Sequence, residues 1–187
     1  LALVPACRKE LEKESPSLAK ADLKVDRIAV GGMVSDVPGM PDSVPDREDR
    51  ADLMASQFSR KRFGSLPVVT FREVRDAMGL ERYESLLAGY QRAGGCDSTA
   101  LADLAAALAG KARFVVFSRI QDDQVGYETS EDTEKKLINY TTTRTARVRV
   151  QFYDLAHQSL AWDHVANGAS SGTEGFDNSD LLEHKAS

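Results

Sequence analysis

The side chain best suited to chemistry in this sequence is the thiol of Cys96. It stands in the segment Gly94–Ser98, directly before a predicted helix that begins near Asp97 or Ser98. The positive end of a helix dipole lowers the pKa of a nearby thiol, and the thiolate is the nucleophilic form. A thiol enzyme would also need a base beside the cysteine. The candidates are the three histidines, His157, His164 and His184. Nucleophilic catalysis by Cys96 is therefore one hypothesis, and a structural cysteine is the simpler one.

The other residues that could take part in catalysis or bind a ligand form no recognisable site. Gly31-Gly32 follows an apolar segment but lacks the glycine and lysine spacing of nucleotide-binding loops. Two cysteines and three scattered histidines do not supply the spaced ligands of a zinc site. The acidic pairs Asp122-Asp123 and Glu131-Asp132 lie in a polar segment, where carboxylates are ordinarily solvated. Cys96 aside, we expect no catalytic residues, no metal site and no cofactor.

The clearest pattern in the chain is an alternation of apolar and polar residues from Thr145 to Tyr153, which predicts a strand. One face carries the apolar side chains Ala146, Val148, Val150 and Phe152. The other face carries a polar and aromatic stripe, Arg147, Arg149, Gln151 and Tyr153. Such a stripe can contact an acidic protein or a glycan. These four are the predicted partner-binding residues; a solvated outer face with ion pairs is the alternative interpretation.

The composition is that of an ordinary globular protein. The 187 residues are 42% hydrophobic and 28% charged, which suits one domain with a core of its own. A net charge of −5 gives no basic field, so we expect no nucleic-acid partner. No segment approaches the roughly 20 apolar residues that span a bilayer as a helix.

The amino-terminal residues predict a lipid anchor. Residues 1–6 are apolar and end in a small residue before Cys7, and the charged residues Arg8 and Lys9 follow at once. This pattern is typical of a signal peptide that runs into a lipobox, in which Cys7 would be acylated and become the mature amino terminus. Pro5 departs from the small or β-branched residue that is usual there. A disulfide between Cys7 and Cys96 in an oxidising compartment is the alternative.

Composition divides the chain into three parts. Residues 1–22 read as a signal-peptide remnant, the lipidation site and a tether, and residues 23–170 as a single α/β domain. Residues 171–187 form a predicted flexible tail, since the chain from Asn167 onward is rich in glycine, serine and acids.

Apolar periodicity within the domain predicts an α/β (α+β) fold with a mixed sheet flanked by helices. Strands are expected at residues 28–34, 66–71 and 112–117, the last of them central in the sheet. Between them we expect an exposed loop over residues 35–49, a helix closed by Gly64, and three more helices. The first of these three begins at a Thr70–Glu73 capping box.

The carboxyl-terminal half of the domain is expected to end in a β-hairpin. Residues 121–136 are polar and read as an exposed excursion, and the hairpin turns at residues 154–158. Leu160 and Trp162 share the inward face of its second strand. The predicted order is β-α-β-α-α-α-β, followed by a C-terminal antiparallel hairpin.

The order of these motifs resembles the small bacterial periplasmic lipoproteins with a CsgG-like or LpoB-like domain, which is also similar to the amino-terminal domain of TolB. The resemblance covers roughly residues 7–170. It consists of the lipobox, a first strand Arg27-Ile-Ala-Val30-Gly, a helix and strand from Phe58 to Val69, and the late hairpin. The hairpin carries the most weight. Its matching residues are Val148-Arg-Val-Gln-Phe-Tyr-Asp154, then Leu160-Ala-Trp162 and Gly168.

The resemblance implies a periplasmic, non-enzymatic regulator or assembly factor that binds a cell-envelope protein and touches the membrane only through its lipid. Arg8, not aspartate, follows Cys7, and by the sorting rule of the family this favours the inner leaflet of the outer membrane. Ring-forming members of the family supply an alternative, namely a subunit of an oligomeric envelope or secretion assembly. A homo-oligomer is therefore among the expected partners.

Overall fold

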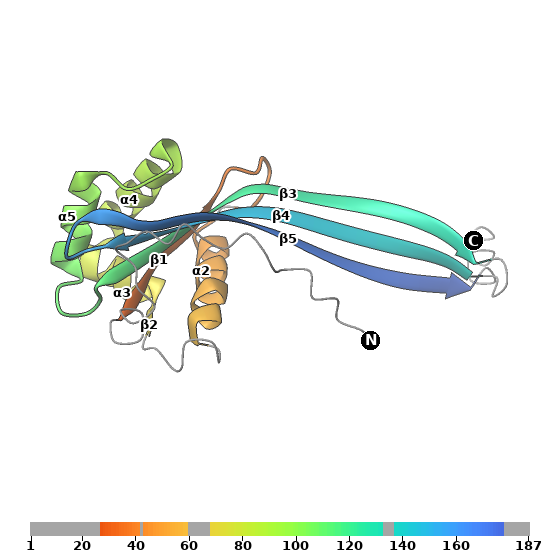
Figure 1. Ribbon diagram of the computed structural model, residues 1–187, viewed down its shortest axis with the longest axis horizontal. Coiled ribbons are helices and arrows are strands. Elements are labelled where there is room, and N and C mark those ends of the chain that lie inside the picture. Colours follow the sequence, from red (N-terminus) through yellow and green to blue (C-terminus); the bar gives the residue numbers. More distant parts are fainter. Residues whose placement is uncertain (1–26, 42, 60–67, 133–136, 178–187) are drawn as a thin grey trace.

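The computed structural model describes residues 27–41, 43–59, 68–132 and 137–177. Figure 1 shows a helical body from which three strands continue as a long arm. The elements are β1 (Ile28–Ser35), α2 (Val44–Ser59), β2 (Val68–Val69), α3 (Phe71–Met78), α4 (Leu80–Ala93), α5 (Ser98–Ala107), β3 (Phe114–Asp132), β4 (Leu137–Asp154) and β5 (Ser159–Asp177). This order confirms the predicted fold class and the predicted succession of elements.

The five strands form one mixed sheet in the order β2-β1-β3-β4-β5. β1 pairs in parallel with β2 and β3, and β3, β4 and β5 form an antiparallel meander. β3 is the central strand, as its continuous apolar run predicts. The sequence from Phe114 to Phe117 is apolar without interruption because both faces of β3 are covered there, and all four residues are fully buried.

Helices cover both faces of the sheet in the body. On one face the Ser118 hydroxyl donates to Met54 Sδ of α2 at 3.2 Å. On the opposite face the next residue, Arg119, donates to the main-chain oxygens of Tyr90 and Gln91 in α4. Successive strand residues point to opposite faces, so these contacts place α2 on one face and α4 on the other.

Gly31 and Gly32 lie inside β1 and not at its end, because an aromatic ring occupies the space of a side chain. A Cβ at Gly31 would lie 2.3 Å from Cζ of Phe117, and the pairing of β1 with β3 shifts by one residue at this point. The Tyr83 hydroxyl donates to the Gly31 carbonyl at 2.7 Å. The role of Gly31 is therefore close packing inside the strand.

The helix boundaries follow from local capping. The Thr70–Glu73 capping box is confirmed, with reciprocal bonds of 3.3 and 2.8 Å between side chains and main-chain N–H groups. α2 begins at Val44, within the predicted 35–49 loop. Ser43 and Asp46 make a similar reciprocal pair at its start, and Pro45 is tolerated in a first turn. β2 has only two residues because Phe71 already belongs to α3. Gly64 lies outside the described residues.

Two predictions for the second half of the chain are wrong. The polar residues 121–132 are strand and not an excursion, and β5 continues through the glycine- and serine-rich residues as far as Asp177. Where burial is described, residues 124–130 and 166–173 are exposed on both faces, so their pairing rests on main-chain hydrogen bonds and not on burial. Polar composition therefore does not exclude a strand here. Residues 133–136 and 178–187 lie outside the description.

The return strand of the hairpin also departs from simple alternation. Trp162 packs against the core, edge-to-face with Phe152 and stacked on His164, which confirms its predicted place. Leu160 is 45% exposed and does not share that face. The register shifts between the pairs Phe152–Trp162 and Tyr153–Leu160, so Ala161 is the extra residue and is itself fully buried.

Candidate functional site

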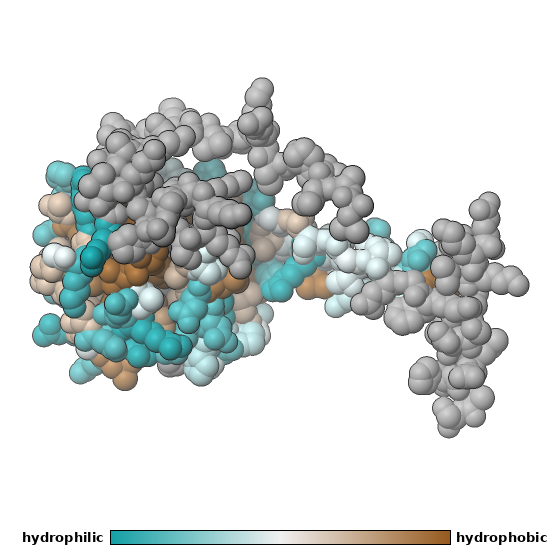
Figure 2. Space-filling model, turned by 90° about the horizontal axis from the view of Figure 1, so that it is seen from below, coloured by the Kyte–Doolittle hydropathy of each residue, from teal (hydrophilic) through white to brown (hydrophobic). Residues whose placement is uncertain are grey.

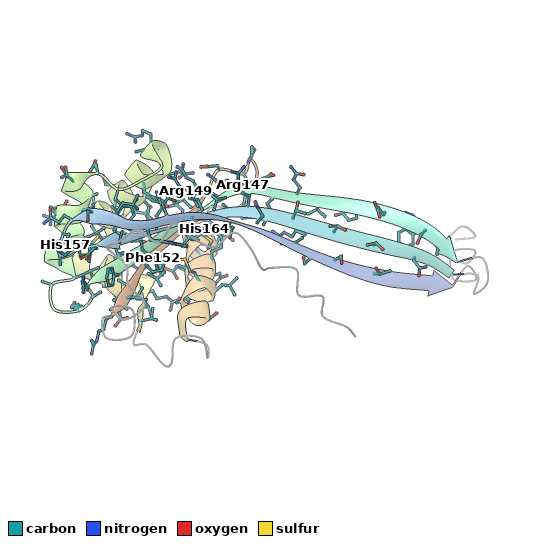
Figure 3. All side chains as sticks on the ribbon, viewed as in Figure 1. Arg147, Arg149, Phe152, His157 and His164 are labelled. Atoms are coloured by element: carbon teal, nitrogen blue, oxygen red, sulfur yellow. The ribbon has the colours of Figure 1, made fainter. Side chains whose placement is uncertain are left out.

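The thiol of Cys96 lies in the α4–α5 connection, beside a groove of about 310 Å³ between these two helices. Burial raises the pKa of this thiol to about 12, and a hydrogen bond with Tyr153 offsets only part of that rise. His157 contacts Asp154 at the far end of the body, and His164 stacks on Trp162, so both are engaged elsewhere (Figure 3). Cys96 is therefore protonated at neutral pH. Cys7 and His184 lie outside the described residues.

We expect Cys96 to react slowly in the native protein. In a Cys7→Ser variant, the rate with an aromatic disulfide reagent at pH 8 should rise by about tenfold or more on unfolding in urea, because the raised pKa keeps the native thiol protonated. The absorbance of the released thiolate measures the rate in both states. Equal native and unfolded rates would show that the thiol is not protected, and only a native rate above the unfolded rate would revive the enzyme hypothesis.

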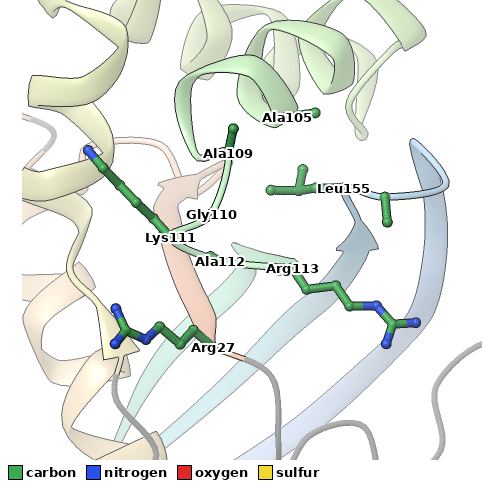
Figure 4. A pocket seen from close by; sticks show the side chains of 9 residues that line it. Arg27, Ala105, Ala109, Gly110, Lys111, Ala112, Arg113 and Leu155 are labelled. Carbon is green, nitrogen blue, oxygen red and sulfur yellow. The ribbon is translucent and has the colours of Figure 1, made fainter.

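A second depression, of about 510 Å³, lies where β1 and β3 begin (Figure 4). Arg27, Lys111 and Arg113 give it a basic rim, and alanine, glycine and leucine side chains make up the rest of its lining. Arg113 pairs with the buried carboxylate of Asp154 at 3.2 Å. None of the lining residues carries a hydroxyl, thiol, imidazole or carboxylate group, so the depression offers a basic surface for an anion and no base beside the Lys111 amine.

The predicted partner-binding stripe does share one face of β4, but that face is the one beneath α4 and α5. Gln151 and Tyr153 are each only 2% exposed. The Tyr153 hydroxyl accepts from the Cys96 main-chain N–H at 3.0 Å and donates to Gln151 at 3.2 Å. These two residues are therefore structural, and their assignment as partner contacts is corrected. Alternation in the sequence shows which residues share a face of the strand. It does not show that the polar face is exposed, because helices cover both faces of this sheet.

The two arginines of the stripe lie where the arm leaves the body (Figure 3). Arg149 is one-third exposed and makes a bidentate ion pair with Asp163 on β5. Arg147 is exposed and stands directly opposite Asp122 of β3. Of the four predicted contacts, only these arginines are accessible to a partner.

The most distinctive surface is the arm, which we define as Asp122–Asp132 of β3, Leu137–Arg147 of β4 and Asn167–Asp177 of β5. It begins where β1 stops pairing with β3, at Ile120, and a register shift at this point separates it from the body. At a rise of about 3.3 Å per residue the arm is about 35 Å long. Figure 1 shows no helix over either of its faces.

Directly paired residues share a face, so the arm has two chemically different faces. The tyrosine face carries Val125, Tyr127, Ile138, Tyr140 and Ala146, together with Thr129, Thr142, the Asp123–Arg144 pair and small residues of β5. It continues the face on which Phe152, Val150 and Val148 lie in the body. The threonine face carries Asp122, Gln124, Glu128, Thr141, Thr143, Thr145 and Arg147, with Ala169, Ser171 and Thr173 of β5.

Large apolar side chains on the tyrosine face are open to solvent. Tyr127 is 78% exposed, Val125 48% and Tyr140 41%. In Figure 2 the arm is mostly pale, with small brown patches, in contrast to the many teal residues of the body. The same side of the sheet is buried under α2 in the body, so an apolar face that is covered at one end is bare along the arm.

Polar pairs hold the arm together. Asp123 makes a bidentate pair with Arg144 at 2.7 and 2.5 Å, which lowers the pKa of the carboxyl. The hydroxyls of Thr141 and Thr173 lie 3.0 Å apart across β4 and β5. Within the described residues, no strand pairs with the outer edge of β5 or with the edge of β3 beyond Ile120. The arm is therefore internally paired and open at both edges.

The described ranges contain neither a candidate metal site nor a candidate membrane-spanning helix. No group of three or more histidine, cysteine, aspartate or glutamate side chains there is placed to hold a metal ion. No helix in the same ranges is long and apolar enough to cross a membrane.

Sequence reasoning missed the arm, although a signal is present. Val125 and Tyr127 alternate with polar neighbours, and a run of threonines, favoured in strands, precedes Thr145. The acidic residues around them masked that alternation.

No protein-family model matches the chain, and no curated protein matches it. Among solved structures, the C-terminal domain of LpoB from Salmonella enterica matches with 9% identity and a TM-score of 0.44, over 83% of this chain and 94% of that one. The hypothetical protein CT253 from Chlamydia trachomatis matches with 14% identity and a TM-score of 0.44, over 76% and 70%. Lipoprotein GNA1162 from Neisseria meningitidis matches with 15% identity and a TM-score of 0.36, over 86% and 91%. LpoB is also one of the proteins that the sequence resembles.

Proposed function

We propose that this chain is a protein-binding module of the bacterial cell envelope, held at the membrane by a lipid on Cys7, and that its partner docks on the arm. The observation that carries the proposal is the tyrosine face, with Tyr127 78% and Tyr140 41% exposed on a part of the sheet that none of the described helices covers. A regulator or assembly factor of this kind performs no chemistry of its own. Its work is to bring a partner to a defined place.

An apolar sheet face that stays in contact with water costs the protein free energy. Each large apolar side chain gives up about 1.5–3 kcal/mol when it stays in water and is not buried. Contiguous apolar surface with a polar rim is typical of protein interaction sites. Tyrosine suits such a site, because its ring packs and its hydroxyl stays solvated. A partner that covers the tyrosine face recovers this free energy.

The arrangement also fits a tethered protein. The described part of the chain begins at Arg27, so about 20 residues connect it to Cys7. We propose that this segment places the body in the periplasm at the inner leaflet of the outer membrane. The arm then extends the reach of the module by its own length of about 35 Å.

The lipid anchor is tested by the intact mass of the mature protein, expressed from its full-length gene and recovered from bacterial membranes. We expect a mass that begins at Cys7 and includes acyl chains, since residues 1–6 have the character of a lipobox. A Cys7→Ser variant should lose both the acyl mass and the membrane fractionation. An unmodified mass in the soluble fraction would overturn the envelope address.

A subunit of an oligomeric envelope assembly is the second candidate. The observation in its favour is the outer edge of β5, where residues 165–173 carry no charge that would discourage edge pairing. Sedimentation across a range of concentrations decides the matter. A constant monomer would exclude self-assembly and leave the partner-binding proposal untouched.

A further inference from the structure

We propose that the open edge of β3 in the arm binds an extended segment of the partner in which basic and apolar residues alternate. The inference deepens the proposed function and depends on it, because it names the chemistry of the partner that docks on the arm. It predicts that the bound segment of the partner is extended, carries positive charge, and alternates between basic and apolar residues.

The edge of β3 becomes free at the point where β1 ends. β1 follows β3 only from Phe114 to Ile120, and Asp36 closes this pairing with a main-chain bond to Ile120 at 2.9 Å. Beyond it, β3 continues as a regular strand whose other side is fully paired with β4. Its free side presents main-chain N–H and C=O groups in the spacing of a sheet edge, which is the template for strand addition.

The side chains of this edge alternate in character. Asp122 and Glu128 lie on the threonine face and are exposed, whereas Val125 and Tyr127 lie on the tyrosine face and are exposed as well. No basic residue follows Arg119 in β3. A strand added here therefore meets the carboxylates of Asp122 and Glu128 on the threonine face and the apolar side chains of Val125 and Tyr127 on the tyrosine face. The one further carboxylate of the tyrosine face among residues 122–130, that of Asp123, is already paired with Arg144.

The paired side of β3 shows which strand this pattern accepts. Along β4, Arg147 stands opposite Asp122 and Arg144 binds Asp123. Ala146 and Val148 alternate with Arg147 and Arg149. Where the arm leaves the body, the partner of β3 inside the chain is thus a basic and apolar strand, and farther out Thr141–Thr143 stand opposite Gly126–Glu128. The carboxylates of an edge strand point to the two faces of the sheet, so they are as accessible from the free side as from the paired side.

The negative charge of the β3 edge also disfavours pairing with the β3 edge of a second copy of this chain. A second copy that paired through its own β3 would set acidic side chains opposite acidic side chains, which destabilises a sheet. The outer edge of β5 is uncharged over residues 165–173 and provides no selection by charge. Specificity therefore lies on the β3 edge, and its occupant is a basic segment of another protein.

The test uses the full chain and a fluorescent peptide with the sequence of Arg144–Tyr153, which carries three arginines, two of them in strict alternation with apolar residues. A second peptide with glutamate in place of each arginine is the control for charge. We expect the basic peptide to bind more tightly by at least about tenfold, measured by fluorescence anisotropy at low salt. Hydrogen exchange of β3 amides in the arm should slow when it binds.

Two double variants localise the binding. Asp122→Asn with Glu128→Gln changes the β3 edge, and Asn167→Lys with Thr173→Lys changes the same two rows at the β5 edge. Both raise the net charge by two, so long-range repulsion of the basic peptide is matched. The β3 variant should weaken binding by about tenfold more than the β5 variant.

Three results would overturn the inference: equal binding of the two peptides, equal losses in the two double variants, or binding without slowed exchange in β3. If a native partner cross-links to the arm while the basic peptide fails to bind, the proposed function stands and this inference falls. If neither occurs, both fall.

Discussion

Replacing Phe117 with alanine is expected to lower the free energy of unfolding by about 3–5 kcal/mol, the largest single loss that the structure predicts. The ring is fully buried at the centre of the sheet. It packs against Tyr90 with ring centroids 4.9 Å apart and meets Tyr153 edge-on at 6.2 Å. It also fills the space above Gly31, so its removal opens a cavity that a glycine has no side chain to fill.

Urea denaturation followed by circular dichroism measures this loss, and Tyr127→Ala is the matched control. Tyr127 belongs to the same strand but is 78% exposed on the arm, so its replacement should change the free energy of unfolding by less than about 0.5 kcal/mol. A loss below about 1 kcal/mol in Phe117→Ala would mean that the β1–β3 packing described here does not hold the body together.

Replacing Asp154 with alanine is expected to cost about 3 kcal/mol. The carboxylate is 1% exposed and organises the turn between β4 and β5. It accepts hydrogen bonds from Arg113, from the His157 ring and from the main-chain N–H groups of Ala156 and His157, at 2.9 to 3.3 Å. Alanine leaves these donors without their common acceptor, so the turn should loosen along with the hairpin.

The charge of Asp154 makes part of this stability depend on pH. Burial by itself raises the pKa of the carboxyl, but the hydrogen bonds from His157, Arg113 and the main chain outweigh it, so the pKa lies below its ordinary value. A lowered pKa contributes stability that is present above the unfolded value of about 3.9 and is lost as the pH falls through the folded value. The stability difference between the native protein and Asp154→Asn should therefore shrink between about pH 5 and pH 2. A difference that stays constant over this range would show that the charge contributes nothing.

The features that sequence predicts correctly are local ones. The Thr70–Glu73 capping box and the Asp97 cap of α5 need only neighbouring residues, and the structure shows both. The continuous apolar run Phe114–Phe117 marks a central strand because it is buried on both faces. These elements fix the order of the fold. The start of α2 was missed because its prolines outweighed the Ser43–Asp46 pair.

The features that sequence does not predict depend on contacts between distant residues. Gly31 is explained only by the ring of Phe117, and the burial of Gln151 and Tyr153 only by the α4–α5 connection above them. The arm is the extreme case. Its strands are polar on one face and weakly apolar on the other, so hydrophobic patterning gives little signal, and pairing among three long strands stabilises them instead.

The most direct test of the central claim, that the arm is the partner-binding surface, is site-specific photo-cross-linking in living bacteria. A photoreactive phenylalanine analogue replaces Tyr127, Tyr140 or Thr143 in the full-length gene. The first two positions lie on the tyrosine face, and Thr143 lies on the threonine face of β4, the middle strand of the arm.

We expect Tyr127 and Tyr140 to give the same cross-linked product, containing one envelope protein, and Thr143 to give little of it. The product should disappear in a Tyr127→Asp, Tyr140→Asp background probed from Val125, which lies on the same face. Irradiation that yields no product from the tyrosine face, or the same product from both faces, would contradict the account.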